Sequence, residues 1–210
     1  MEPPNGQLEF SITEEETSSK NREATDTIDG LRYIENYIDE TQETWLLTRI
    51  EQHPWLDDLK RRVQHYGFKY DYRARKVNLD MRIGALPDWL HRLSQKLHDE
   101  GHLPELADQV IINEYLPGQG IANHIDCEPC FEGTIASLSL HSACVMNFTN
   151  RRDRKRKLPV WLEPRSLIVL QGDARYEWLH GITGRKTDDW EGERFTRQRR
   201  VSLTFRKVIL

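Results

Sequence analysis

The second half of this chain is a succession of short apolar segments separated by turn-forming residues. Seven segments of five to eight residues follow Gly101, at 110–115, 134–140, 143–148, 158–162, 166–171, 175–179 and 200–207. Segments of this length, divided by Pro, Gly, Asn or charged residues, are typical of β-strands. A chain of 210 residues can pack two sheets around one core. The sequence therefore predicts a mainly β fold, a double-stranded β-helix or jelly-roll.

Two helical segments precede these strands. One is expected to start at Thr41 as its N-cap, to kink at Pro54 and to continue as an apolar stripe through Val63. The other lies between Pro87 in its first turn and Gly101 just after its end. Its apolar residues recur at helical spacing: Leu86, Leu90, Leu93 and Leu97. We expect both helices to pack on one sheet.

The charge of the chain is unevenly distributed. Residues 1–29 hold eight acids and two cations, a net charge of 2 − 8 = −6, whereas the whole chain carries −4. Residues 30–210 therefore carry −4 − (−6) = +2. The acidic segment 1–29 lacks apolar periodicity, which predicts a disordered tail before one folded domain at 30–210. Its charge suits either a protein partner or competition for a basic groove.

The composition also predicts where the protein works. The N-terminus lacks the basic and apolar regions of a signal peptide, and no apolar run approaches the length of a membrane span. Three cysteines are too few for a disulfide framework and favour a reducing compartment. We expect a monomer in the cytoplasm or nucleus. Cys127 and Cys130 have zinc-site spacing, but no second ligand pair follows, so oxidation of Cys127 is more credible than a zinc site.

Two histidines and one aspartate form a candidate metal centre. His124 and Asp126 lie two residues apart, so their side chains share one face of an extended segment. His180 follows Asp126 by 54 residues and completes a set of two imidazoles and one carboxylate. Such a set covers one face of octahedral Fe(II) and leaves three positions for substrate and dioxygen. Ordinary structural roles are the alternative, because the chain has eight histidines.

The last strand carries a second group of polar residues. Arg200 and Arg206 are six residues apart and share a strand face with Ser202 and Thr204. Paired guanidinium groups suit a dicarboxylate such as 2-oxoglutarate, because a planar guanidinium binds a carboxylate through two hydrogen bonds. Exposed charges on an edge strand are the alternative. The residues on the other face are expected to pack in the core: Val201, Leu203 and Phe205.

Taken in order, these motifs resemble the AlkB family of Fe(II)- and 2-oxoglutarate-dependent dioxygenases. The resemblance covers 112–120, 124–126, 137–140, 164–167, 175–176, 180–182 and 200–206. Within the family, 118–120 and 165–167 look most similar to the oxygenase domain that hydroxylates a modified wobble uridine in tRNA. The resemblance implies Fe(II), 2-oxoglutarate and dioxygen as cofactors, and a nucleic acid as substrate.

The resemblance also implies a role for individual residues. His124, Asp126 and His180 would be the iron ligands. Asn113 and Tyr115 would hydrogen-bond 2-oxoglutarate, and Arg200 would bind its distal carboxylate. Arg206 would lie near the carboxylate on the iron and orient Asp126, while Ser202 and Thr204 could line the same pocket.

Substrate contacts are expected from three segments. Segment 66–76 resembles the family's nucleotide-recognition loop, and its Tyr70, Tyr72 and Arg73 suit stacking on a flipped base plus phosphate contact. Glu128 stands where DNA-repair members often have an acid that touches the base. The run 151–157 has six cations in seven residues and suits phosphate contact through four of them: Arg151, Arg152, Arg154 and Lys155. A solvated hairpin loop and a nuclear localisation signal are alternatives for this run.

The reaction has two outcomes that these residues do not separate. Hydroxylation of an N-methyl carbon ends in loss of formaldehyde and demethylation, whereas hydroxylation of a carbon side chain leaves a stable alcohol. We expect tRNA or another single strand as substrate, because the chain lacks an apolar wedge flanked by cations for opening duplex DNA. A protein side-chain substrate and a non-catalytic nucleic-acid-binding module are the alternatives.

Overall fold

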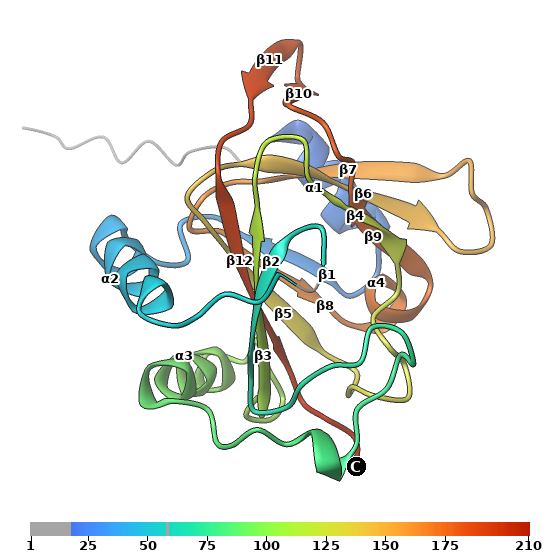
Figure 1. Ribbon diagram of the computed structural model, residues 1–210. Coiled ribbons are helices and arrows are strands. Elements are labelled where there is room, and N and C mark those ends of the chain that lie inside the picture. Colours follow the sequence, from blue (N-terminus) through green and yellow to red (C-terminus); the bar gives the residue numbers. More distant parts are fainter. Residues whose placement is uncertain (1–17, 58) are drawn as a thin grey trace, which may run out of the picture.

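Two antiparallel sheets pack face to face in the computed structural model, which describes residues 18–57 and 59–210 (Figure 1). The larger sheet has strand order β1-β8-β5-β12-β3-β2, and the smaller has order β4-β9-β6-β7. The larger comprises β1 (Leu31–Ile34), β2 (Arg62–Tyr66), β3 (Gln109–Tyr115), β5 (Ile135–Leu140), β8 (Leu167–Leu170) and β12 (Arg200–Arg206). The smaller comprises β4 (Ile121–His124), β6 (Cys144–Asn150), β7 (Lys157–Leu162) and β9 (Trp178–Ile182). This architecture confirms the predicted jelly-roll.

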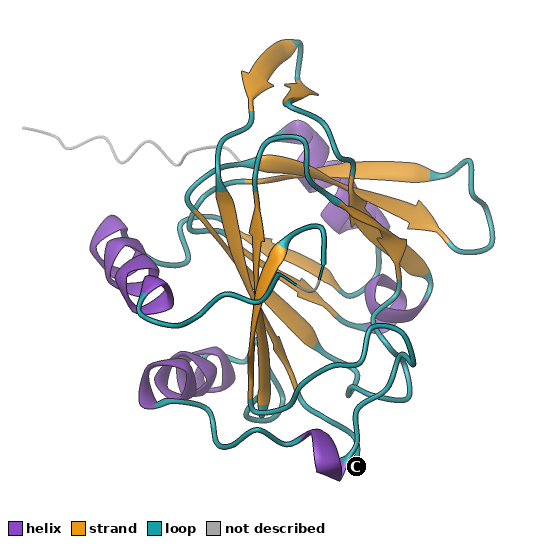
Figure 2. Ribbon diagram, in the orientation of Figure 1, coloured by secondary structure: helices purple, strands orange, loops and turns teal. Residues whose placement is uncertain are grey.

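Two helices cover the outer face of the larger sheet, α2 (Glu40–Glu51) and α3 (Asp88–Asp99) (Figure 2). Leu90, Leu93 and Leu97 of α3 are buried in one cluster with Val201 and Leu203 of β12. This burial explains the helical spacing of the leucines, because one face of α3 packs on the sheet. The opposite face of β12 looks into the space between the two sheets. Strand alternation thus separates a packing face from a polar face.

The N-terminal segment contradicts one prediction. Residues 18–29 do not belong to a disordered tail, because α1 (Ser19–Thr27) packs beside β7. Asn21 is buried and exchanges two hydrogen bonds with the backbone of Trp161, and Ala24 is fully buried. These contacts provide the ordering that the segment's own composition does not. The prediction for residues 1–17 lies outside the described residues.

The first predicted helix also differs in its limits. Asp39, not Thr41, is the N-cap of α2, because its carboxylate accepts from the Gln42 amide while the Gln42 side chain accepts from the Asp39 amide. The helix ends at Glu51, and no helical stripe continues to Val63. Pro54 cannot donate to a helix, and Val63 lies in β2, where it pairs with Leu56.

One predicted strand is partly a helix. Segment 175–179 divides into the end of α4 (Gly172–Tyr176) and the start of β9. Arg175 in α4 is 2% exposed and donates to backbone carbonyls of the loop that follows β4, including that of Asp126. These hydrogen bonds hold the Arg175 side chain against the loop while its backbone is helical, so Arg175 does not take part in β9.

Two further elements project from the sheets. A short hairpin joins β10 (Thr187–Trp190) and β11 (Glu193–Thr196), and Trp190 in it stacks on Trp161 of β7. The segment after β2 crosses the mouth of the jelly-roll and contains the 3₁₀ turn η1 (Leu79–Met81). None of the helices in residues 18–57 and 59–210 has the length and apolar content needed to span a membrane.

Candidate active site

A cavity of about 530 Å³ opens between the two sheets. The larger sheet contributes polar residues of β3 and β12, and the smaller sheet contributes the ends of β4 and β9. Segments 59–61 and 70–75 close one side. The cavity therefore collects the predicted metal ligands, the β12 polar face and part of the nucleotide-recognition loop in one place.

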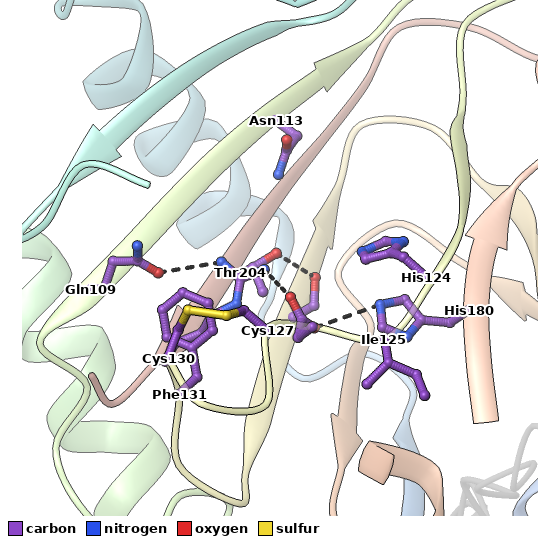
Figure 3. A network of polar contacts seen from close by, with 12 residues as sticks. Gln109, Asn113, His124, Ile125, Cys127, Cys130, Phe131, His180 and Thr204 are labelled. Carbon is purple, nitrogen blue, oxygen red and sulfur yellow. Dashed lines mark hydrogen bonds and ion pairs between the residues drawn. A yellow bond between two sulfur atoms is a disulfide. The ribbon is translucent and has the colours of Figure 1, made fainter. Parts of the chain in front are cut away.

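The three predicted metal ligands converge in this cavity. His124 and His180 are direct cross-strand partners in β4 and β9, and their ring centroids are 4.5 Å apart. Asp126 follows β4, with its Oδ2 3.6 Å from Nε2 of His180. One donor atom from each residue lies within 4.8 Å of the other two, a spacing that a single metal ion can bridge. Figure 3 shows the two imidazole rings beside each other within this network.

Close backbone contact between β4 and β9 makes this convergence possible. A Cβ atom on Gly181 would lie 2.3 Å from Oδ1 of Asn123, and one on Gly120 would lie 2.1 Å from the carbonyl oxygen of Ile182. Only glycine fits at such a separation. The two glycines therefore let the strands that carry His124 and His180 approach.

The protonation states suit metal binding. Nδ1 of His124 lies 2.8 Å from the carbonyl oxygen of Ala122, which can only accept, so this bond leaves the Nε2 lone pair of His124 free. Burial lowers the pKa of His180 to about 3, which keeps this imidazole neutral. Burial opposes ionisation of Asp126, but the combined attraction of Arg206, the two histidines and Arg175 outweighs it and holds the pKa of this carboxyl well below its usual range. Neutral imidazoles and an ionised carboxylate are the metal-binding forms.

The loop that carries Asp126 is fixed from two sides. Arg175 donates to the carbonyls of Asp126 and Phe131 at 2.9 and 3.2 Å. Cys127 and Cys130 form a disulfide, visible in Figure 3, which the cysteine count does not predict. A turn between them, in which the Cys130 amide donates to the Cys127 carbonyl, brings the two sulfurs together. Cys144 is free and buried.

A cross-strand ladder lines the opposite wall. Arg200 of β12 pairs with Tyr115 of β3, and Ser202 pairs with Asn113. All four residues line the cavity, as does Thr204, so the even spacing along each strand predicts the shared face correctly. Their individual binding roles stay predictions.

Arg200 is a buried cation without an acidic partner in the described part of the chain. It is 3% exposed, donates to the Ser139 hydroxyl at 2.8 Å and lies over the Tyr115 ring. Its Nε has no hydrogen-bond partner. Buried charges are ordinarily paired, so this guanidinium suits an anionic ligand such as a terminal carboxylate of 2-oxoglutarate.

Arg206 joins the two walls. Its guanidinium donates to Oδ1 of Asp126 at 2.7 Å and to the Gln109 side chain at 3.4 Å. It also lies over the ring of Phe131. This position agrees with the predicted orientation of Asp126. With three metal-binding donors and an unpaired cation in one cavity, the residues present fit Fe(II) and 2-oxoglutarate.

The nucleotide-recognition loop meets the cavity through different cations than the sequence predicts. Tyr70 and Tyr72 line it in an edge-to-face pair, 4.9 Å between centroids. Arg73 is exposed and lines an adjacent cavity instead. Arg75 takes the predicted place, lining the main cavity and donating to the Ile125 carbonyl at 3.3 Å. The turn 71–74, in which Asp71 accepts from two backbone amides, separates the two arginines.

The other predicted substrate residues lie outside the main cavity. Glu128 is exposed and paired with Arg151 at 3.1 Å, so the structure gives it no contact with a base in the cavity. Arg152 pairs with Glu177. Arg154 and Lys155 are exposed in the loop between β6 and β7, where they are free to meet a phosphate.

A second cationic cluster, at Arg194, Arg197, Arg199 and Arg200, also favours nucleic-acid binding in the sequence. The structure instead pairs the first three with acids. Arg194 bonds Asp189, Arg197 bonds the buried Asp188, and Arg199 bonds Glu114 and Glu51. These three arginines are therefore engaged in ion pairs within the chain rather than free to contact phosphates.

Sequence reasoning missed three cationic residues of the cavity. Lys60, Arg61 and Arg75 line the cavity, and Nε of Arg61 donates to the Asn113 side chain at 2.9 Å. None belongs to a strand with alternating polarity, so no spacing rule identifies them. The concentration of cations around residues 60–76 is the one signal that the sequence offers.

Known proteins share this arrangement. The sequence pattern of the 2OG-Fe(II) oxygenase superfamily matches residues 56–206. A solved structure described as OsALKBH1 superposes with a TM-score of 0.63 at 15% identity, covering 85% of this chain and 98% of that one. An oxidoreductase of the 2OG-Fe(II) oxygenase family from Burkholderia pseudomallei superposes with a TM-score of 0.56 at 15% identity, covering 84% and 83%. At this identity both show a common fold.

Sequence relatives are closer. Uncharacterized protein L905 of Acanthamoeba polyphaga mimivirus is 34% identical over 87% of this chain and 86% of its own length. The alkylated DNA repair protein ALKBH8 homolog of Arabidopsis thaliana is 34% identical, and the tRNA (carboxymethyluridine(34)-5-O)-methyltransferase ALKBH8 of Macaca fascicularis is 37% identical. The aligned regions cover 86% and 85% of this chain but only 59% and 30% of those two proteins. This chain belongs to the 2OG-Fe(II) oxygenase superfamily and, within it, to the AlkB homologues, enzymes that use Fe(II), 2-oxoglutarate and dioxygen.

Proposed function

We propose that this dioxygenase hydroxylates a modified uridine at the wobble position of tRNA. The observation that carries the proposal is the charge of the cavity. Among the residues that the structure describes, five cations line it against one carboxylate, that of Asp126: Lys60, Arg61, Arg75, Arg200 and Arg206. The two charges of Fe(II) and the two of 2-oxoglutarate cancel, so the excess of cations persists when both are bound.

This excess discriminates between kinds of modified base. N-methylation of a ring nitrogen that normally accepts a hydrogen bond makes the base cationic, and like charges disfavour binding in a site shielded from water. A uridine whose side chain ends in a carboxylate or an ester is anionic or neutral and is not repelled. Glu128, which could have offset the excess, is paired with Arg151 outside the cavity.

The two sides of the cavity would bind different components of the reaction. His124, Asp126 and His180 would hold iron, and Arg200, with Asn113 and Tyr115, would hold 2-oxoglutarate. Bound iron, 2-oxoglutarate and dioxygen together supply oxidation of a C–H bond to C–OH, with succinate and carbon dioxide as coproducts. The protein orients the reactants and excludes water.

The surface around the cavity suits a nucleic acid. Tyr70 and Tyr72 at the cavity wall offer aromatic faces and edges to a flipped base. Arg154 and Lys155 offer unpaired charges to the phosphate backbone. The proposed substrate is consistent with work in the cytoplasm or nucleus, where tRNA is found, and with a monomer. Residues 1–17, the acidic part of the proposed partner-binding tail, lie outside the described residues.

Oxidative demethylation of a neutral methylated base is the second candidate. The DNA N6-methyl adenine demethylase of Caenorhabditis elegans is 29% identical over 94% of this chain and 67% of its own length. A base methylated on an exocyclic amine stays neutral, so the cavity charge does not disfavour it. This candidate shares every proposed ligand with the first.

Mass spectrometry of two RNA panels separates the candidates. One panel holds tRNA anticodon stem-loops with wobble-uridine side chains, and the other holds N-methylated bases in single and double strands. Each is incubated with protein, Fe(II) and 2-oxoglutarate before oxygen is admitted. We expect a gain of about 16 mass units in the first panel, one oxygen atom. A loss of about 14 mass units confined to the second panel would refute the proposal in favour of demethylation.

A further inference from the structure

Arg61 differs from its neighbour Arg62 in what it contacts. Arg62 is paired with the buried carboxylate of Glu114 on the outer side of β3. Arg61 lines the cavity, is half-buried, and has no carboxylate partner in residues 18–57 and 59–210. A guanidinium held away from water and without a counter-ion is available for an acceptor on a ligand.

The position of Arg61 is determined by three contacts. Its Nε donates to Oδ1 of Asn113 at 2.9 Å. Its Cζ lies 5.8 Å from the ring centroid of Tyr115 and 5.9 Å from that of Tyr72. Tyr115 belongs to the cosubstrate wall, the side of the cavity that we propose binds 2-oxoglutarate through Asn113, Tyr115 and Arg200. Tyr72 belongs to the nucleotide-recognition loop. Arg61 thus sits where the two halves of the proposed site meet.

The bond to Asn113 also fixes the direction of its amide. With Oδ1 accepting from Arg61, Nδ2 of Asn113 is left to donate, and it has no partner among the described residues. An amide in this orientation can donate to a carboxylate oxygen of 2-oxoglutarate. Because Nε is used in this bond, the two terminal nitrogens of Arg61 remain for a second ligand.

We propose that Arg61 is a specificity-determining residue that binds a carboxylate or ester oxygen on the side chain of the substrate uridine. This inference rests on the proposed function and assigns its substrate selection to one residue. Among the cavity cations, Arg200 is buried and bonded to Ser139, and Arg206 is bonded to Asp126. Arg61 is the one that joins the tyrosine of the nucleotide-recognition loop to the cosubstrate wall.

Two anticodon stem-loops test the inference, identical except that the wobble uridine carries a carboxymethyl or a methyl group at C5. Binding of each RNA, and separately of 2-oxoglutarate, is measured anaerobically to the Mn(II)-loaded wild type and to the variants Arg61→Ala, Arg61→Lys and Arg62→Ala. Wild type is expected to prefer the carboxymethyl RNA. Arg61→Ala should lower the affinity for that RNA by about tenfold or more, the effect of losing one charge-assisted hydrogen bond. Its affinity for the methyl RNA should change little.

The other variants separate specificity from structure. Arg61→Lys keeps the charge, so it should retain part of the RNA preference while binding 2-oxoglutarate more weakly through loss of the Asn113 contact. Arg62→Ala removes the neighbouring guanidinium, which pairs with Glu114 and does not line the cavity, so it should keep the full preference. Retained affinity for the methyl RNA shows that Arg61→Ala is folded.

The two possible failures are distinguishable. An unchanged carboxymethyl preference in Arg61→Ala, in an enzyme that hydroxylates wobble uridine, overturns the role of Arg61 alone. A wild type that is loaded with Fe(II) and 2-oxoglutarate and hydroxylates neither RNA when oxygen is admitted refutes the proposed function together with this inference.

Discussion

Replacement of Arg200 by methionine should move ligand affinity and protein stability in opposite directions. Arg200 is 3% exposed and, in the described part of the chain, has no acidic partner. Removing one member of a buried ion pair costs about 3–5 kcal/mol, so 2-oxoglutarate affinity should fall by at least about a hundredfold. The free protein, by contrast, loses a buried charge whose desolvation costs several kcal/mol.

The contacts that offset this desolvation are limited. The hydrogen bond to Ser139 contributes about 1.5–3 kcal/mol and the contact with the Tyr115 ring about 0.5–2 kcal/mol. The stability of metal- and cosubstrate-free Arg200→Met should therefore be unchanged or raised by about 1–2 kcal/mol. Urea denaturation in a chelator measures stability, and calorimetric titration of Mn(II)-loaded protein measures affinity.

The neighbouring residue provides a matched control. Arg199 points to the other side of β12, where it pairs with Glu51 and the buried Glu114. Arg199→Met should lose about 1–3 kcal/mol of stability, because the buried carboxylate keeps only one partner, and should bind 2-oxoglutarate normally. Equal loss of stability in both variants, with 2-oxoglutarate affinity retained in Arg200→Met, would refute the assignment of Arg200 as a ligand-binding cation.

Three further predictions follow from buried polar contacts. Asn21→Ala should lower stability by about 2 kcal/mol in urea denaturation, because it removes two hydrogen bonds to the Trp161 backbone, and no loss would show that α1 does not stabilise the fold. Arg206→Met should weaken Mn(II) binding, followed by electron paramagnetic resonance, about 10–100-fold through loss of the Asp126 contact, and unchanged affinity would contradict an orienting role. The third concerns pH. Burial opposes ionisation of Glu114, but two arginines lower its pKa below the ordinary value of 4.5. The ionised carboxylate therefore contributes stability above that pH, and this contribution is lost as the pH falls through the pKa of the folded state. Glu114→Gln should flatten the acid limb of the stability curve, and an unchanged limb would assign it to other carboxylates.

The sequence predicts elements whose patterns agree with their tertiary contacts. The leucines of α3 recur at helical spacing because one face packs on the sheet, and β12 alternates because its two faces meet different environments. The sequence does not predict α1, because its order depends on Asn21 and Ala24 meeting β7, a strand more than a hundred residues away. Likewise, segment 175–179 has the composition of a strand, but its first residue, Arg175, lies in α4 and donates to the carbonyls of a distant loop.

The site divides in the same way. His124, Asp126 and His180 are found from residue type and spacing, because β-strand periodicity relates the first two and chemistry selects the third. Glu128 sits at a suggestive spacing, yet its partner Arg151 comes from another hairpin, and local sequence cannot indicate that pairing. Contacts made across the fold are the part that sequence spacing leaves open.

Arginine pairs in two regions show how this fold separates structural cations from ligand-binding ones. In Arg61–Arg62 and in Arg199–Arg200, one member faces the outer side of β3 and pairs with Glu114, while the other lines the cavity and has no acidic partner within residues 18–57 and 59–210. In each pair the two arginines are adjacent in the sequence, and their side chains point to opposite sides. A buried cation without a counter-ion is costly, so the buried Arg200 favours a ligand that supplies negative charge, and the half-buried Arg61 does so to a smaller extent. Both then serve the cavity, Arg200 toward the cosubstrate and Arg61 toward the substrate, and the single carboxylate of Glu114 serves both outward members.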